Sequence, residues 1–261
     1  MNGVYIRYDA AGADGVAQIT LDRPDRLNAM DRAGFAALAG AMDRADGDAA
    51  VRAVVLAGAG EKAFCAGADI RELAALGPGT AVEASAHGQG ACDRIEALGK
   101  PVIAAIRGFA LGGGCEIALA CTLRIASADA QIALPETMLG TIPGYGGTQR
   151  LARLVGPGRA LEMILTARRV GAQEALRIGL VEEVCESDVV ARAREVAAAI
   201  ARNGPVAVRL AIEAVRRGLD GSLGEGLALE RALFGVAAGT TDMREGMRAF
   251  IEKRKPMFEG R

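Results

Sequence analysis

Short apolar runs and segments of helical periodicity alternate along the first part of the chain. Residues 15–21 alternate as in a strand, whereas residues 51–57 and 101–106 are continuous apolar runs, as in strands covered on both faces. Asp31 can cap a helix that extends to about residue 43, and residues 113–123 form an apolar helix followed by a strand at 123–126. This alternation predicts an α/β fold with much parallel pairing.

The pattern becomes almost wholly helical after residue 156. The predicted helices cover residues 157–167, 172–178, 189–202 (capped by Ser187 or Asp188), 205–218, 222–238 and 242–255, the last two opening with capping boxes at Ser222/Glu225 and Asp242/Glu245. The three helices that end the chain cannot bury all their apolar faces alone, so we expect them to pack on the core or on another subunit. Residues 77–80 (Gly-Pro-Gly-Thr) are the best candidate for a mobile loop.

Composition and charge exclude several classes of protein. The 261 residues are 51% hydrophobic, which is enough for one large core. A net charge of −1 leaves no electrostatic footprint for nucleic acid, and the basic cluster at Arg248 and residues 253–255 is typical of a solvated helix end. No apolar run is long enough to span a membrane, and the one histidine, His87, excludes multi-histidine metal sites and makes Ser-His-Asp catalysis unexpected.

The cysteines and the start of the chain indicate a cytoplasmic location. Five cysteines are scattered without paired spacing, and residues 1–9 contain no apolar core of a secretory leader. We therefore expect buried or free thiols in a reducing compartment.

Two carboxylates and a run of glycines carry the strongest chemical signal. Gly112, Gly113 and Gly114 follow a strand and open a helix, so their N–H groups can be aimed at a ligand with the helix dipole behind them. Glu116 lies three residues after the start of that apolar helix, where an ionisable group is unusual, and Glu136 follows twenty residues later, just after a proline. Ordinary explanations remain for each feature. The glycines could form a tight strand-to-helix turn, Glu116 could interact favourably with the helix dipole, and Glu136 could be a turn residue.

A second loop of small residues follows the strand at 51–57. Ala66, Gly67 and Ala68 would let a carbonyl approach the backbone, and Asp69 would cap the segment that begins at Ile70. Two such loops after parallel-type strands predict convergence at one end of the sheet, where α/β proteins bind ligands. Residues 58–63 match a loose dinucleotide fingerprint, but another glycine-containing loop follows them in place of an amphipathic helix.

Taken together, these motifs resemble the enoyl-CoA hydratase (crotonase) family along nearly the whole chain. The resemblance is carried by Arg23-Pro-Asp-Arg-Leu-Asn-Ala29, residues 64–69, 100–108 and 110–116, Pro135-Glu136, residues 143–149, Gly179-Leu-Val181 and residues 244–253. It implies a crotonase-like α/β spiral of ββα units, with residues 1–200 as the acyl-CoA-binding and catalytic core. Residues 201–261 would then form a C-terminal helical region that assembles homotrimers or homohexamers.

The resemblance also implies roles for individual residues. The N–H groups of Ala68 and Gly113 match an oxyanion hole, and Glu116 and Glu136 match the two catalytic glutamates of the hydratases. The residues implied in substrate or CoA binding are Lys62, Ala66, Gly67, Ala68, Asp69, Ile70, Gly112, Gly113, Tyr145, Phe250 and Lys253. Of these, Phe250 and Lys253 match positions that reach the CoA of a neighbouring subunit. No separate cofactor is implied, because coenzyme A is part of the substrate.

The activity implied is reversible syn addition of water to a trans-2-enoyl-CoA. Family isomerases usually keep one glutamate, so the pair favours a hydratase over a Δ3,Δ2-enoyl-CoA isomerase or another acyl-CoA enzyme of the same fold. The glutamate pair also argues against a non-catalytic member of the fold, and the absence of a basic surplus argues against an RNA-binding member. Leu134 and Tyr145 depart from the residues found in many relatives, and residues 80–99 should shape the acyl pocket, so chain-length preference stays open.

Overall fold

Two mixed sheets form the centre of the molecule. The computed structural model describes residues 5–261, so the expectation for residues 1–9 lies partly outside the described chain. One sheet has the order β1-β2-β3-β5-β7-β10 and is parallel except for β1, and the other has the order β4-β6-β8-β9 and is parallel except for β9. The strands are β1 (Ile6–Asp9), β2 (Val16–Leu21), β3 (Ala53–Gly58), β4 (Ala63–Cys65), β5 (Val102–Ile106), β6 (Phe109–Leu111), β7 (Leu123–Ser127), β8 (Gln131–Ala133), β9 (Val170–Gly171) and β10 (Glu183–Cys185).

From β3 to β8, each turn of the chain adds one strand to each sheet before the next helical segment. Thus β3 and β4 precede α2 (Ile70–Leu73) and α3 (Pro78–Ala97), and β5 and β6 precede α4 (Gly113–Ala120). The third turn, β7 and β8, leads into the 3-10 helix η2 (Glu136–Leu139). These repeats are the ββα spiral implied by the resemblance, and they bring the ends of successive strands to one edge of the molecule.

The larger sheet is covered on both faces, which explains its continuous apolar runs. Val54 and Leu56 of β3 pack in a core with α1 (Arg32–Gly47), α3 and α4, whereas the alternate residue Val55 packs against α8 (Val189–Ala201). The remaining helices of the core are α5 (Gly147–Val155), α6 (Pro157–Thr166), α7 (Ala172–Arg177) and the 3-10 helix η1 (Pro24–Arg26). Every residue of α4 is buried, so this helix lies at the centre of the fold.

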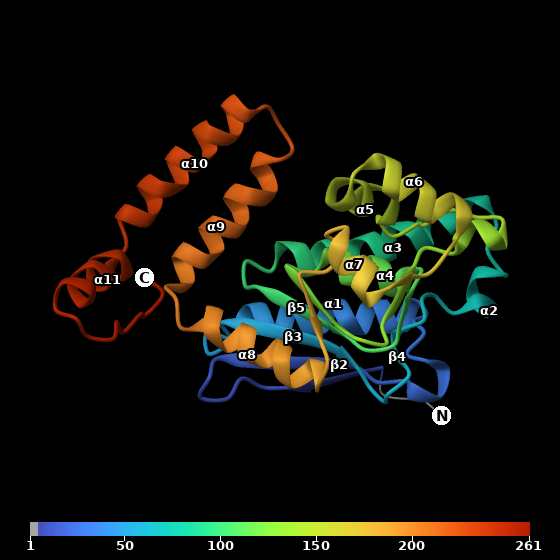
Figure 1. Ribbon diagram of the computed structural model, residues 1–261, viewed down its shortest axis with the longest axis horizontal. Helices are drawn as coiled ribbons and strands as arrows, with labels where there is room; N and C mark the ends of the chain where they lie inside the picture. The colour runs from blue at the N-terminus through green and yellow to red at the C-terminus, as the bar shows by residue number, and fades with distance from the viewer. Residues whose placement is uncertain (1–4) are drawn as a thin grey trace.

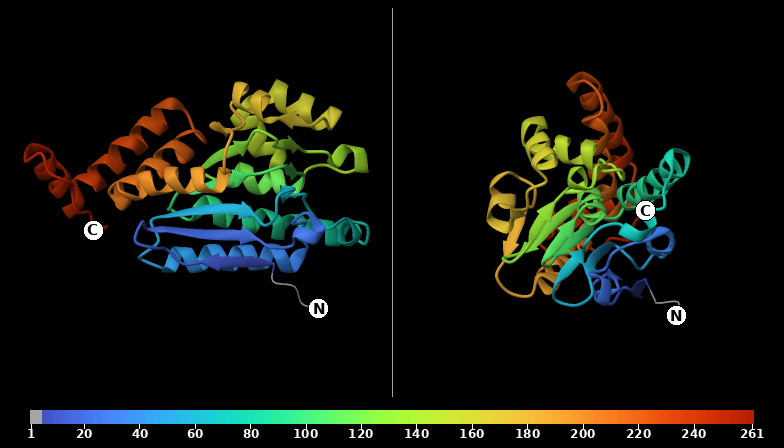
Figure 2. Two further views of the ribbon diagram at one scale, coloured as in Figure 1. Left: turned by 60° about the horizontal axis from the view of Figure 1, so that its bottom comes forward. Right: turned by 90° about the vertical axis from the view of Figure 1, so that its right-hand side faces the viewer.

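The C-terminal helices extend away from the sheets. Helices α9 (Pro205–Gly218) and α10 (Leu223–Ala238) form a hairpin, and α11 (Thr241–Ile251) lies at its far end (Figures 1 and 2). Arg216 fastens α9 to the core, because its guanidinium donates to the backbone oxygens of Glu96 and Ala120. Of the two packing partners expected for these helices, the core contacts little of α10, none of whose residues is buried.

Most elements predicted from the sequence are confirmed within a few residues. The caps at Asp31, Asp69 and Asp188 each accept a backbone N–H of the helix that follows, and Ser222 and Glu225 form the predicted capping box. The five cysteines are buried and unpaired, as expected. Among residues 5–261 no helix combines the length and apolar character needed to cross a membrane.

Three local predictions were wrong. Residues 77–80 are not a mobile loop, because α3 begins at Pro78 and the Thr80 hydroxyl accepts the Gly77 N–H. The last helix is capped by Thr240 instead of Asp242, whose carboxylate accepts two N–H groups of the C-terminal tail. The apolar helix at 113 ends at Ala120, three residues early. By contrast, the rejection of the dinucleotide fingerprint at residues 58–63 is confirmed, because these residues connect β3 to β4 and do not open a helix.

Candidate active site

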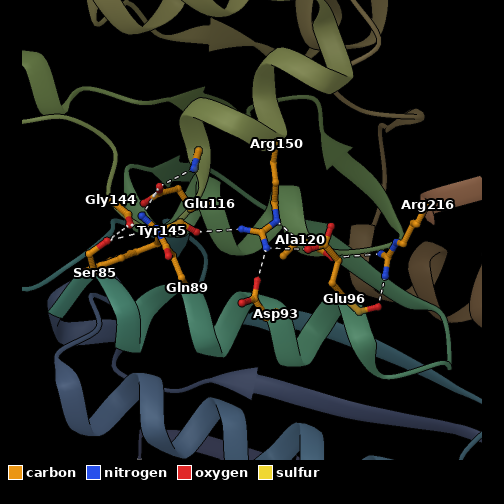
Figure 3. Close-up of polar contacts among 11 residues, drawn as sticks. Ser85, Gln89, Asp93, Glu96, Glu116, Ala120, Gly144, Tyr145, Arg150 and Arg216 are labelled. Atoms are coloured by element: carbon orange, nitrogen blue, oxygen red, sulfur yellow. Dashed lines mark hydrogen bonds and ion pairs between the residues drawn. The ribbon is translucent and has the colours of Figure 1, made fainter. Parts of the chain in front are cut away.

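Glu116 is buried in the centre of the fold and is held by two backbone donors. Its Oε1 accepts the N–H of Tyr145 at 2.7 Å and the N–H of Gly147 at 2.8 Å (Figure 3). Gly147 is the first residue of α5, so the carboxylate lies at the positive end of a helix dipole. A Cβ on Gly147 would lie 2.9 Å from the same oxygen, which explains the glycine.

The protonation of Glu116 reflects opposing influences. Burial is the largest influence and raises the pKa of Glu116 above its ordinary value, while the Gly147 and Tyr145 donors and the nearby charge of Arg150 limit the rise. A carboxylate stabilised in this way can stay ionised in an apolar setting and accept a proton from a bound reactant.

Glu136 lies close by in a different environment. It begins η2, and a Cβ added to Gly112 would lie 2.7 Å from its Oε1, so the carboxylate lies against the backbone of the glycine run. Its Oε2 is buried and lacks a hydrogen-bond partner among residues 5–261. Burial, together with the charge of Glu116, raises the pKa of Glu136 to about 7. One member of the pair is therefore suited to act as a base and the other as an acid.

The two small-residue loops converge beside these carboxylates, as predicted. A Cβ on Gly113 would lie 3.4 Å from the Ala68 nitrogen, and a Cβ on Gly67 would lie 3.3 Å from the Gly113 nitrogen. Neither the Ala68 nor the Gly113 N–H donates to a backbone carbonyl within the described part of the chain. Two neighbouring N–H groups without internal acceptors, one at the start of α4, can bind a carbonyl oxygen that is gaining negative charge.

Asn28 is a buried residue beside this site to which sequence reasoning assigned no role. It is 1% exposed, and its amide donates to the carbonyls of Ala59 at 3.0 Å and Ala63 at 2.8 Å. Its side-chain oxygen also accepts the Arg23 N–H at 2.9 Å. Because the backbone of residues 27–30 in turn pairs with residues 66–69, Asn28 fixes the loop that presents the Ala68 N–H. The sequence contained this residue only as one position of the Arg23–Ala29 motif. Its role depends on hydrogen bonds to distant backbone groups, which the sequence does not show.

The aromatic ring of Tyr145 occupies the space between the glycine run and α3. A Cβ on Gly113 would lie 3.1 Å from the ring, and a Cβ on Gly88 of α3 would overlap it at 2.1 Å. The ring also meets Phe35 edge-on, with 4.8 Å between centroids. Residues 80–99 therefore reach the site as the helix α3, which sequence analysis did not predict as a helix.

The residues implied in CoA binding divide into two groups. Lys62 precedes β4, and Ala66, Asp69 and Ile70 follow it, so these residues lie on the segment that leads to the Ala68 N–H. Phe250 lies on α11 and Lys253 just beyond it, at the end of the molecule opposite α2 (Figure 1). Within one chain, the structure does not bring these two residues to the carboxylates.

His87 and the cysteines are outside this chemistry. His87 is exposed on α3, where its ring lies 2.7 Å from the Glu83 carbonyl, as expected for an ordinary surface histidine.

Comparison with known proteins agrees with this geometry. Residues 11–261 match the family described as enoyl-CoA hydratase/isomerase. The chain belongs to this family. It is 48% identical over 246 residues to a putative enoyl-CoA hydratase/isomerase of Bacillus subtilis, covering 94% of this chain and 95% of that protein. It is 47% identical over 241 residues to the short-chain-enoyl-CoA hydratase of Clostridium acetobutylicum, covering 92% of each.

Solved structures of the hydratase/isomerase family confirm the fold class. The crystal structure of an enoyl-CoA hydratase from Bacillus anthracis superimposes with a TM-score of 0.94 at 45% identity, covering 99% of this chain and 100% of that one. A second hydratase structure, from Geobacillus kaustophilus, gives a TM-score of 0.93 at 42% identity over the full length of both chains. The ββα spiral with C-terminal helices is thus the fold of the enoyl-CoA hydratase/isomerase family.

Proposed function

We propose that the protein is an enoyl-CoA hydratase that adds water reversibly to a trans-2-enoyl-CoA and forms a 3-hydroxyacyl-CoA. The observation that carries this proposal is the pair of buried carboxylates beside two N–H groups without internal acceptors. Full-length relatives named as hydratases support the same activity.

The reaction places negative charge on the thioester oxygen. Water attacks Cβ of the enoyl group, and the electrons of the double bond pass through Cα into an enolate. The N–H groups of Ala68 and Gly113 would stabilise that oxygen, and donors of this kind contribute about 3 kcal/mol each to the transition state. Because the charge is larger in the transition state than in the substrate, this stabilisation speeds the chemical step.

The two glutamates would handle the protons. Glu116, which is oriented by the Tyr145 and Gly147 N–H groups, would take a proton from the attacking water. Glu136, whose raised pKa keeps it protonated below about pH 7, would deliver a proton to Cα. Both groups act in reverse during dehydration. Because both carboxyl groups would act on the same side of the substrate, they favour syn addition.

The direct test is loss of enoyl absorbance when the purified protein meets crotonyl-CoA. We expect fast turnover in the parent protein and loss of about a hundredfold or more in Glu116→Gln and in Glu136→Gln, with binding of CoA esters retained. No turnover with enoyl-CoA of any length would contradict the hydratase activity. Conversion of a 3-enoyl-CoA without hydration of the 2-enoyl-CoA would indicate the isomerase instead.

We further propose that residues 1–200 form the catalytic core and residues 201–261 assemble the protein as a homotrimer or homohexamer. The support is the apolar surface of α10 and α11, where Leu227, Phe234 and Phe250 are 51%, 68% and 84% exposed. Contiguous apolar surface of this kind is characteristic of interfaces between subunits. Assembly would also place Phe250 and Lys253 against the CoA of a neighbouring subunit.

Light scattering of the purified protein tests the assembly. We expect the mass of three or six chains, and a loss of assembly in Phe234→Asp, with Glu230→Asp on the same helix as the control. A monomeric parent protein would contradict this proposal.

The five buried, unpaired cysteines support a reducing compartment such as the cytoplasm.

A further inference from the structure

One face of α3 carries a row of polar side chains that points at residues 144–150, the segment whose backbone N–H groups donate to Glu116. Ser85, Gln89, Asp93 and Glu96 are spaced four, four and three residues apart, so they lie along one face of the helix. Figure 3 shows these side chains directed toward residues 144–150. No step of the proposed reaction uses them.

The first two members of the row hold a single carbonyl. The Ser85 hydroxyl donates to the Gly144 oxygen at 2.6 Å, and the Gln89 amide donates to the same oxygen at 3.1 Å. The Gly144 carbonyl and the Tyr145 N–H belong to one planar peptide unit and point in opposite directions. Fixing the carbonyl therefore fixes the direction of the N–H that donates to Glu116. Two donors on the carbonyl also polarise the peptide and strengthen that N–H as a donor.

The other two members of the row act through Arg150. Asp93 and Glu96 each accept from its Nη2 at 2.7 Å, and its Nη1 donates to the Tyr145 carbonyl at 3.0 Å. Nη1 lies so close to Gly146 that a Cβ there would overlap it at 2.1 Å, and Gly146 has a φ of +104°. Arg150 thereby fixes the next peptide unit, which connects Tyr145 to the glycine that precedes Gly147.

We propose that Ser85, Gln89 and Arg150 are positioning residues that aim the Tyr145 and Gly147 N–H groups at Glu116. The inference rests on the proposed role of Glu116 as the base of the reaction. None of the three side chains donates to Glu116 directly. Ser85 and Gln89 act through the backbone of residues 144–147, and Arg150 acts through that backbone in addition to its charge. A general strut for the loop would stabilise the protein equally well but would leave the acidity of Glu116 unchanged. The pH profile therefore separates the two roles.

The test compares Ser85→Ala, Gln89→Leu, their double variant and Arg150→Lys in the hydration of crotonyl-CoA. We expect each single change at α3 to lower kcat about threefold, because one donor remains, and the double change to lower it about tenfold or more. KM should stay within about twofold, because the polar groups of these side chains are engaged by the Gly144 and Tyr145 carbonyls. The acid limb of kcat/KM should move up by about half a pH unit or more as Glu116 loses donor strength.

Arg150→Lys keeps the charge and most of the volume but loses the fork that reaches both Glu96 and the Tyr145 carbonyl. We expect it to shift the same acid limb, while Ser85→Thr, which keeps the hydroxyl, should restore parental behaviour. Matched controls are His87→Ala on the exposed face of α3 and Arg153→Met on α5, whose guanidinium donates to Gln149 of its own helix. Chemical denaturation of each variant separates loss of activity from loss of folding.

Three results would overturn the inference. A double variant with parental kcat and an unmoved acid limb would show that the row is a strut only, and so would losses equal to those of the control variants. A parent protein without turnover would refute the hydratase activity, and the inference would fall with it. An active parent with unaffected variants refutes the inference alone.

Discussion

Gly112→Ala tests whether Glu136 depends on the absence of a side chain at this position. Gly112 has a φ of +51° and a ψ of −125°, a conformation that only glycine adopts readily. An alanine there would add backbone strain of about 1–3 kcal/mol. Its Cβ would also lie 2.7 Å from Oε1 of Glu136, so the carboxylate or the glycine run must shift.

Gly156→Ala is the matched control, because it has the strain without the contact. Gly156 has a φ of +84° and a ψ of 154°, and a Cβ there meets no atom within 4 Å. Both variants should lose stability by about 1–3 kcal/mol in chemical denaturation. Only Gly112→Ala should lose activity, by about a hundredfold in kcat, since a displacement near 1 Å at a catalytic group has an effect of that size.

The assay is crotonyl-CoA hydration followed by enoyl absorbance, at a temperature where both variants are folded. The reasoning is refuted if Gly112→Ala keeps a kcat within about threefold of the parent, or if Gly156→Ala loses as much activity as Gly112→Ala. Equal losses would mean that strain anywhere in the core, and not the placement of Glu136, limits the rate.

Three further predictions concern the pH profile, the acyl pocket and the loop that holds the oxyanion site. Hydration needs a protonated Glu136, so kcat/KM should fall about tenfold per pH unit above about pH 7, where this group ionises, and a profile flat to pH 9 would contradict its role as the acid. Tyr145→Ala removes the ring that lies against Gly113 and Gly88, so turnover of decenoyl-CoA should rise relative to crotonyl-CoA; an unchanged ratio would show that the ring does not limit the acyl chain. Asn28→Ala leaves two carbonyls and one N–H without their partner, and thermal unfolding should show a loss of about 2–3 kcal/mol of stability together with reduced turnover, whereas an unchanged melting temperature would argue against the buried amide as the anchor of this loop.

Local chemistry explains why so many elements were predictable. A strand covered on both faces needs a continuous apolar run, and a helix start needs an acceptor for its free N–H groups, so β3, β5 and the cap at Asp31 are encoded within a few residues. The glycine run and Glu116 were also predictable as a candidate site from neighbouring residues, because glycines between a strand and a helix and a glutamate in an apolar helix are both unusual. Failures came where two local solutions compete. Thr240 and Asp242 can each cap α11, and only the returning C-terminal tail decides between them.

Residue types and spacing were enough to predict the candidate residues: two glutamates, two loops of small residues, and the turns that allow the backbone to approach a ligand. The environment of those residues follows from contacts between distant segments of the folded chain. The pKa of Glu136 depends on burial and on Glu116, two effects that exist only after β6, β8 and α4 have packed. The direction of the Tyr145 N–H, which donates to Glu116, depends on Ser85, a residue 59 positions before Gly144 in the chain. Hydrogen-bond directions and desolvation are set by contacts between distant segments, and no pattern of neighbouring residues records them.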